Sequence, residues 1–407
     1  MRLLLLTPQL PYPPHQGTTI RNYNVIRQLA TRHEVNLLSF AGHACELDAA
    51  APLRDVCRSV QVIPVPPRTT AQRLRTLLTS ALPDMAMRLP SPAFHDALAA
   101  FLAYEAPDIV QVEGIEMAQY GLAIAATRSG ARPLLVFDDH NAEYVLQRRA
   151  FETDVHRPRR WIAAAYSWLQ WHRLARYERL MCLTHDRIVV ASDADRSALR
   201  RLLPDLAVSV IPNGVDTALY VRDAGGCAGI TIPPHSLVFT GKMDFRPNID
   251  GVTWFVHRVL PAIRAQVPDA CFYIVGMKPH PRVLALGGEP GVVVTGYVDD
   301  VRPYIAAADV CVVPLRIGGG TRLKIMESMA MSAVVVATSL GCEGFPLEHG
   351  KHLMIADSPE QFAATVVALL RDPGARARLG AEARRFVEAR YDWASIVPLF
   401  EQVYASH

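Results

Sequence analysis

The sequence lacks the patterns that mark disulfide-rich, metal-binding and membrane-spanning proteins. Its seven cysteines form no CxxC pair, and Cys271 and Cys311 sit inside apolar runs, which indicates buried thiols in a reducing compartment. The fourteen histidines show no ligand spacing such as HExxH, so we predict no metal site. There is no apolar run of about 18 residues, and the run of residues 3–6 is too short for a signal peptide. We therefore expect a cytoplasmic protein.

Strong charge of either sign is also missing. The formal net charge is +3 over 407 residues, and no nucleic-acid-binding motif is present, so nucleic acid is not an expected partner. Hydrophobic residues make up 50% of the chain and charged residues 20%, which is enough to build sizeable cores. The chain is long for one domain and suits two.

Short apolar runs alternate with longer helical patterns from end to end. Runs such as residues 108–114, 134–140, 237–243 and 309–315 are apolar on both faces and rich in Val, Ile and Leu. This composition is typical of parallel strands covered by helices on both sides. The alternation predicts an α/β protein with doubly wound domains.

A break in the pattern indicates where the domains meet. Residues 217–235 contain Gly-rich turns and a Pro-Pro pair without any period, which predicts an interdomain linker. We therefore expect a first domain over 1–216 and a second over 236–390. The amphipathic segment near the end, within 391–407, predicts a helix that needs a surface to pack on.

Glycines, cations and one histidine follow the predicted strands. Ligands of parallel sheets bind beyond the carboxyl ends of the strands, so these positions are candidates for a binding site. They are Gly17, Thr18, His140, Lys242 and Arg246. For His140, a purely structural hydrogen-bonding role stays open. The neighbouring Asp138 and Asp139 point to opposite faces of a strand, so we do not expect them to act together as an acid/base pair.

The stretch "PLRIGGGTRLKIMES" (314–328) combines bare backbone with cations at a predicted helix start. Three glycines expose their amides, Thr321 is a favourable N-cap, and helix N-termini bind anions. Arg322 and Lys324 oppose the helix dipole unless a phosphate offsets them. Glu327, one turn along, could accept hydrogen bonds from sugar hydroxyls. A tight turn followed by a surface Lys324–Glu327 pair is the alternative. The stretch is not a Walker A motif, and the missing GxGxxG disfavours a dinucleotide-binding fold.

The arginine- and tryptophan-rich helical segment 157–180 allows two interpretations. It could rest on an acidic membrane surface, because aromatic and basic residues suit that interface. It could equally be a domain helix with its tryptophans packed inward. Peripheral contact with the inner face of the membrane therefore stays open.

With these motifs in view, the chain resembles GT-B glycosyltransferases of the retaining family 4 over nearly its whole length. The resemblance is carried by "PYPPHQGTTIRN", "VIPNGVD", "FTGKMDFRPNIDGVTWF" and "RIGGGTRLKIMESMAM". The first and last look most like the subgroup associated with exopolysaccharide gene clusters. The family implies two Rossmann-like domains facing each other across a cleft. The first domain would bind the acceptor, and the second would bind the nucleotide-sugar donor. It also implies that a C-terminal helix, within 391–407, crosses back to the first domain.

The resemblance also implies a reaction and its residues. A sugar would pass from a nucleoside-diphosphate sugar, such as a UDP- or GDP-sugar, to a sugar or lipid-linked acceptor hydroxyl, without a metal or cofactor. His140 resembles the histidine near the transferred sugar, and Lys242 and Lys324 would meet the diphosphate. The remaining expected donor-binding residues are Gly17, Thr18, Arg246, Val298, Gly319, Gly320, Thr321, Arg322 and Glu327.

One departure from the family pattern keeps alternatives open. Glu327 matches the second glutamate of the E-x7-E motif, but Gly319 stands at the first. A related sugar-nucleotide epimerase and a catalytically weak nucleotide-binding partner protein are the alternatives to a transferase in polysaccharide or glycoconjugate biosynthesis. The sugar, the nucleobase, the acceptor and the oligomeric state are not predicted.

Overall fold

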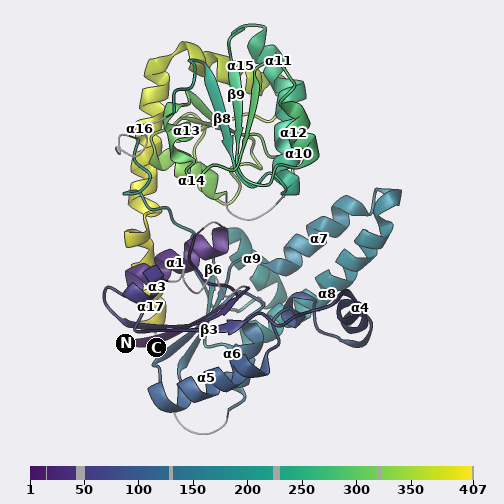
Figure 1. The fold of residues 1–407 in the computed structure, drawn as a ribbon, viewed down its shortest axis with the longest axis vertical. Coiled ribbons are helices and arrows are strands. Elements are labelled where there is room, and N and C mark those ends of the chain that lie inside the picture. Colours follow the sequence, from purple (N-terminus) through teal and green to yellow (C-terminus); the bar gives the residue numbers. More distant parts are fainter. Residues whose placement is uncertain (15, 43–50, 128–131, 223–229, 319–321, 406–407) are drawn as a thin grey trace. The chain divides into compact units, whose positions relative to one another are not determined.

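The computed structural model forms two compact units. One contains residues 1–212 together with 396–407, and the other contains residues 213–395. The structure describes residues 1–14, 16–42, 51–127, 132–222, 230–318 and 322–405. Each unit is an α/β domain whose strands all run parallel (Figure 1).

The first unit is built on a seven-stranded sheet in the order β3-β2-β1-β4-β5-β6-β7. This order reverses direction between β1 and β4, which creates the switch point typical of doubly wound sheets. The strands are β1 (Arg2–Thr7), β2 (Glu34–Ala41), β3 (Ser59–Pro64), β4 (Ile109–Glu113), β5 (Leu134–Asp139), β6 (Arg187–Val190) and β7 (Val208–Val210).

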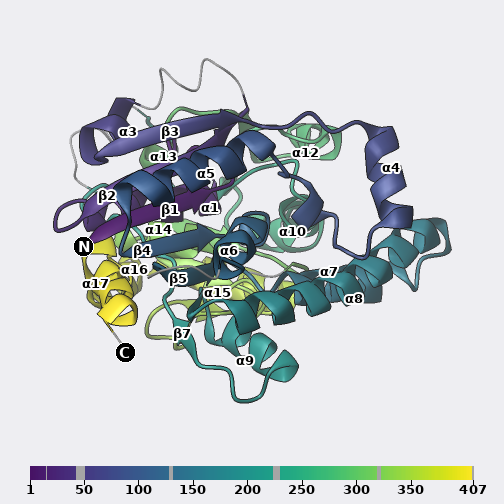
Figure 2. The same ribbon diagram turned by 90° about the horizontal axis from the view of Figure 1, so that it is seen from below.

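Helices cover both faces of this sheet because its central strands are largely apolar on both sides. Leu3 to Leu6 of β1 are all fully buried, and the alternate residues Leu4 and Leu6 belong to one core with Phe94 and Tyr120. The helices are α1 (Gly17–Leu29), α3 (Ala51–Val56), α4 (Thr70–Thr79), α5 (Pro92–Glu105), α6 (Ala118–Ala125), α7 (Glu143–Asp154), α8 (Trp161–Thr184) and α9 (Asp193–Leu202), with short 3-10 turns η1 (Met85–Met87) and η2 (Pro158–Arg160). Figure 2 shows α7 and α8 lying side by side as a hairpin.

The second unit is built on a six-stranded sheet in the order β10-β9-β8-β11-β12-β13. Its strands are β8 (Ser236–Thr240), β9 (Cys271–Val275), β10 (Val292–Gly296), β11 (Val310–Val313), β12 (Val335–Ala337) and β13 (Met354–Ile355). Its helices are α10 (Arg246–Trp254), α11 (Leu260–Arg264), α12 (Pro281–Leu286), α13 (Arg302–Ala307), α14 (Leu323–Ala330), α15 (Pro359–Arg371) and α16 (Pro373–Arg390), with a π-turn η3 (Phe255–Val259) between α10 and α11.

The last helix, α17 (Trp393–Ala405), starts in the second unit and belongs to the first unit from Ile396 onward. Within the first unit, Glu401 forms an ion pair with Arg32 at 3.0 Å and lies 2.8 Å from the imidazole of His33. The hydroxyl of Tyr404 donates to buried Gln111 of β4. The surface that the amphipathic sequence requires is therefore supplied by the turn after α1 and by β4.

The two units divide the chain at Pro212, four residues before the boundary expected from the sequence. Thr217 and Tyr220 come from the predicted linker, yet both bond to residues of the second unit. The five cysteines among the described residues form no disulfide. None of the helices in the described ranges is both long and apolar enough to cross a bilayer.

Candidate active site

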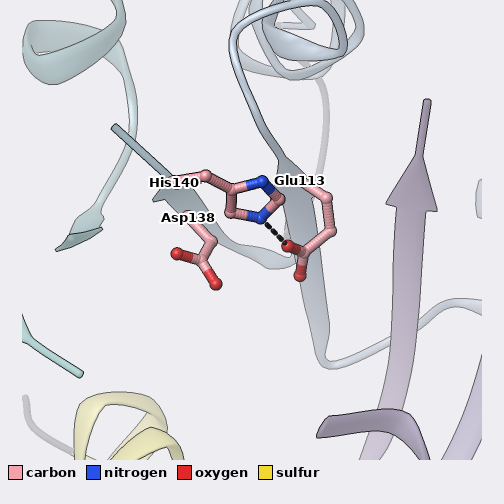
Figure 3. A group of neighbouring side chains, drawn as sticks. All are labelled: Glu113, Asp138 and His140. Carbon is pink, nitrogen blue, oxygen red and sulfur yellow. Dashed lines mark hydrogen bonds and ion pairs between the residues drawn. The ribbon is translucent and has the colours of Figure 1, made fainter. Parts of the chain in front are cut away.

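In the first unit, charged side chains gather where β4 and β5 end. Glu113 is the last residue of β4 and pairs in register with Asp138 of β5, and His140 follows the end of β5 (Figure 3). Parallel neighbouring strands end at the same edge, so three polar residues from two strand ends come together there. His140 was expected at this position, whereas Glu113 was not.

A short hydrogen bond joins His140 to Glu113. The Nε2 atom of His140 lies 2.7 Å from Oε2 of Glu113, and Asn22 of α1, with its amide nitrogen toward Glu113, donates to the same oxygen at 3.0 Å. Burial, followed by the charge of Asp138, raises the pKa of Glu113. Burial alone would lower the pKa of His140, but the bond to Glu113 and the charge of Asp138 raise it overall. The bond to Glu113 holds the imidazole in one orientation.

Asp138 is bonded to a buried arginine. Arg21 of α1 donates from Nε and Nη2 to the two oxygens of Asp138 at 2.9 and 3.1 Å, and both side chains are almost fully buried. Nη1 of Arg21 also donates to the carbonyls of Ile211 and Pro212. The pair fastens α1 to β5 and to the end of β7, so the loop that precedes α1 leads to a fixed point beside His140.

The same cluster offers a spacing that a metal ion could use. Ligand atoms of Glu113, Asp138 and His140 all lie within 4.8 Å of one another. However, Arg21 already occupies both oxygens of Asp138, and its positive charge disfavours a second cation. The arrangement is that of a hydrogen-bonded network, and we derive no metal chemistry from it.

A pocket of about 600 Å³ lies beside this network within the first unit. Its walls include Thr18 and His140, so the structure brings these two predicted residues to one cavity. Gly17 is the first residue of α1 and is exposed. Glu116 and Glu143 also line the pocket, and burial raises the pKa of Glu143 to about 7.

In the second unit, Lys324 occupies the centre of a second group of polar residues. It lies in the first turn of α14, and its ammonium donates to Oδ1 of Asn248 at 3.1 Å. The same nitrogen lies 3.8 Å from the centre of the Phe239 ring, a cation–π contact. Burial lowers the pKa of Lys324 to about 7; the nearby charge of Glu327 opposes this and that of Arg322 adds to it.

Gly241 leaves the space that Lys324 occupies, and Gly276 leaves space for the backbone of Gly241. Gly241 follows β8 with φ near +152°, and a Cβ atom there would lie 2.8 Å from the lysine nitrogen and 2.9 Å from Nδ2 of Asn248. Gly276 follows β9, and a Cβ atom there would collide with the carbonyl of Gly241 at 1.7 Å. The carboxyl ends of two adjacent strands therefore need glycine for close backbone packing.

Glu327 lies one turn along α14 from Lys324 and is bonded to a tyrosine. The hydroxyl of Tyr220 donates to Oε1 of Glu327 at 3.1 Å. Burial raises the pKa of Glu327, whereas the tyrosine bond and the charge of Lys324 lower it. Tyr220, from the segment predicted to be a linker, was not expected at this site.

The other predicted residues of the second unit that the structure describes lie in loops or at helix starts. Lys242 is exposed, with its ammonium 3.7 Å from Asp244, and its carbonyl accepts from Asn248 at 2.8 Å. Arg246 is the first residue of α10, and Val298 lies in the loop after β10. Arg322 is buried at the N-cap position of α14, which begins at Leu323. Gly319, Gly320 and Thr321, including the predicted N-cap, lie outside the described residues.

Comparison with solved structures identifies the fold. Sucrose-phosphate synthase of Thermosynechococcus elongatus is similar with a TM-score of 0.74 and 19% sequence identity, over 99% of this chain and 98% of that one. The HepE protein of Anabaena, solved with UDP, is similar with a TM-score of 0.68 and 15% identity, over 100% of both chains. These likenesses show the fold, which is that of the GT-B glycosyltransferases.

Comparison with protein families identifies the family of the chain. Residues 16–219 match the family described as Glycosyltransferase Family 4, and residues 234–372 match the family described as Glycosyl transferases group 1. The chain therefore belongs to glycosyltransferase family 4 and is a glycosyltransferase. A curated relative, "Uncharacterized 44.6 kDa protein in cps region" of Klebsiella pneumoniae, is 22% identical over 165 residues, which cover 39% of this chain and 42% of the relative.

Proposed function

We propose that the chain is a retaining glycosyltransferase that moves a sugar from a UDP- or GDP-sugar to an acceptor hydroxyl. The observation that carries this proposal is the position of Lys324. It is a half-buried cation in the first turn of α14, beside the glycine-backed ends of β8 and β9. A diphosphate is the ligand that suits a cation, a helix start and closely packed backbone together.

The leaving nucleoside diphosphate gains negative charge as its bond to the sugar breaks. In our proposal Lys324 and Arg322 offset that charge, with Lys242 and Arg246 as further cations. Preorganised groups aimed at developing charge each contribute on the order of 3 kcal/mol to catalysis. Glu327 would accept hydrogen bonds from the ribose hydroxyls, with Tyr220 holding the carboxylate in place through the 3.1 Å bond. Val298, in the loop after β10, would meet the nucleobase through its backbone.

In the first unit, His140 would position and polarise the transferred sugar. Its orientation by Glu113 supports this role, because a general acid/base or polarising group works only when its imidazole is fixed. Glu113 and Asp138 are bonded to His140 and Arg21, which disfavours either carboxylate as an attacking nucleophile. We therefore propose that the leaving phosphate takes the acceptor's proton on the same face of the sugar, which retains the anomeric configuration. Gly17 and Thr18 would approach the donor from the start of α1.

The pocket beside His140 would receive the acceptor. Among its acidic lining residues, Glu116 accepts a hydrogen bond from Arg88 at 3.1 Å, and the other two are Asp139 and Glu143. Burial raises the pKa of both of these carboxyls, which disfavours their charged forms. Such a lining suits an uncharged, hydroxyl-rich acceptor better than an anionic one. The likeness of part of the chain to a protein of a cps region supports a role in polysaccharide biosynthesis.

Incubation with radiolabelled UDP- and GDP-sugars and candidate acceptors tests the proposal. Transfer of label to an acceptor with the donor's anomeric configuration, read by NMR of the product, is the expected result. Interconversion of sugar nucleotides without an acceptor would instead indicate an epimerase. Nucleotide binding without turnover across neutral and anionic acceptors would indicate a partner protein and overturn the proposal.

A further inference from the structure

Two neighbouring elements of the first unit present large apolar side chains to solvent. In the amino-terminal half of α8, Trp161 is 62% exposed, Ile162 is 91% exposed and Trp168 is 49% exposed. On α4, Leu74 is 59% and Leu78 is 77% exposed. Nη2 of Arg173 in α8 donates to the Leu77 carbonyl of α4 at 2.9 Å, which ties the two helices together (Figure 2). We call this the α4–α8 surface.

The exposed apolar side chains recur at helical spacing, so they share one face of each helix. Trp161, Ala165 and Trp168 stand at i, i+4 and i+7, so they share one face of α8, with Ile162 beside them. Ala164 and Ser167, which follow on one flank of this face, are buried. Leu74 and Leu78 stand at i and i+4 on α4, a helix with no buried residue. Clustered apolar exposure of this kind marks an interaction site, whereas scattered single residues do not.

The segments that carry these apolar side chains are rich in arginine and poor in acidic residues. Residues 155–177 contain five arginines and no Asp or Glu, and residues 68–83 contain three arginines and no acid. Asp154 and Asp84 bond to Arg160 and Arg68, both at 2.9 Å. Arg157 and Arg159, in and beside η2, are exposed. The α4–α8 surface is therefore both apolar and positively charged.

We propose that the α4–α8 surface docks on a bilayer rich in anionic phospholipid. Ile162, Leu74 and Leu78 would enter the boundary between headgroups and acyl chains. Trp161 and Trp168 would lie at headgroup level, where amphipathic rings are favoured. The arginines of η2 would meet lipid phosphates. Charge complementarity selects an anionic lipid surface, because a neutral bilayer or an apolar protein groove would leave these arginines without counter-charges.

Flotation with vesicles tests the docking. Full-length protein is mixed with vesicles of phosphatidylcholine alone, or of phosphatidylcholine with about one third phosphatidylglycerol. We expect binding to the anionic vesicles only, weakened by salt, with a blue shift of tryptophan fluorescence. Charge reversal in Arg157→Glu/Arg159→Glu should lower partitioning by more than the roughly fivefold expected for each arginine lost. Ile162→Ser/Trp168→Ser should lower it by roughly tenfold or more, because each methylene kept out of the membrane costs about fourfold.

Matched variants separate docking from general surface effects. Tyr104→Ser removes an 88% exposed ring from α5 of the same unit, and Arg258→Glu/Arg282→Glu reverses two exposed charges in the second unit. Both controls should bind vesicles like the parent protein. Absence of binding by the parent, equal loss in the controls, or unchanged binding in both α4–α8 variants overturns the proposal. A concentration-dependent dimer that Ile162→Ser/Trp168→Ser dissolves, with no vesicle binding, would assign the surface to a second copy of the chain instead.

Discussion

The ammonium of Lys324 lies 3.8 Å from the centre of the Phe239 ring and 3.1 Å from Oδ1 of Asn248. Neither partner carries a negative charge, so burying the charged ammonium costs desolvation free energy. A bound anion would offset that cost. The carboxylate of Glu327 is the nearby group that favours its charge, and a tyrosine hydroxyl also bonds that carboxylate. The second unit thus holds a cation ready for a ligand.

Lys324→Ala should weaken binding of UDP or GDP by about tenfold or more, since a hydrogen bond to a charged group contributes about 1.5–3 kcal/mol. Fold stability should change by less than about 1 kcal/mol, because the residue is already penalised by burial. Calorimetric titration gives the affinity and urea unfolding gives the stability. Lys351→Ala, an exposed lysine bonded to Glu348, is the matched control and should bind nucleotide like the parent. Equal affinity in Lys324→Ala would make the lysine purely structural.

The lowered pKa of Lys324 predicts proton uptake on binding. With a pKa of about 7, a substantial fraction of Lys324 is neutral at pH 8 without ligand, and an arriving diphosphate recharges it. Nucleotide binding at pH 8 should therefore take up protons, and affinity should fall as pH rises above 7. Titration calorimetry in two buffers of different ionisation enthalpy measures the uptake. The same lowered pKa makes the contribution of Lys324 to unfolding free energy rise from pH 7 toward 10, because the unfolded lysine keeps its proton longer. Proton uptake that persists in Lys324→Ala would assign the effect elsewhere.

Gly241→Ala should reduce nucleotide affinity by displacing Lys324. The added Cβ atom would lie 2.8 Å from the lysine nitrogen and 2.9 Å from Asn248, closer than real Cβ contacts allow. Gly350→Ala is a control for backbone strain, because Gly350 also has positive φ, +77°, but no atom lies within 4 Å of its added Cβ. Both variants should lose about 1 kcal/mol of stability from strain, and only Gly241→Ala should lose affinity. If Gly350→Ala lost as much affinity, crowding at Lys324 would not be the cause.

His140→Ala should retain donor binding and lose transfer by about 10²–10⁴-fold, the usual contribution of a positioned acid/base group. Glu113→Gln should lower transfer as well, because it removes the charge that orients the imidazole. Transfer assays and nucleotide titrations on the same preparations separate the two effects. His257→Ala, at an exposed position of the second unit, is the control. Unchanged transfer in His140→Ala would remove this histidine from the active site.

Asp138→Asn should destabilise the first unit by about 3–5 kcal/mol, since it leaves Arg21 buried without its counter-charge. The exposed pair of Arg148 and Glu152 gives the comparison, and Glu152→Gln should cost no more than about 0.5 kcal/mol. Urea unfolding measures the loss, and hydrogen exchange of the β1 and β5 amides assigns it to the first unit. A loss below about 1 kcal/mol would mean that water or another group reaches Arg21.

The fold could be predicted from the sequence because most of the parallel strands are apolar on both faces. Residues 134–140 and 237–243 each contain a strand, and the residues that follow them stand at the carboxyl ends. The two-residue strand β13 was missed, since Met354 and Ile355 are too few to form a pattern. The helix expected to begin at Thr321 starts at Leu323 in the structure.

The partners of the candidate residues could not be predicted, because they are distant in the sequence. Arg21 and Asp138 are 117 residues apart, and Tyr220 and Glu327 are 107 apart. No periodicity connects such pairs. One local signal did exist: Glu113 ends an apolar run and precedes Gly114, as His140 ends another run. Two polar residues at neighbouring strand ends could have been paired once the strand order was known.

Helix α17 has a consequence for how the protein is synthesised. The ribosome makes residues 213–395 before the segment from Ile396 onward, which completes the first unit with Phe400 against Arg21 and Tyr404 against Gln111. The amino-terminal unit therefore lacks this helix until residues 396–407 have been made, while the second unit has all its residues before then. A fragment of residues 1–212 would lack this closing helix, so a separately expressed first unit needs residues 396–407 supplied by fusion or as a peptide.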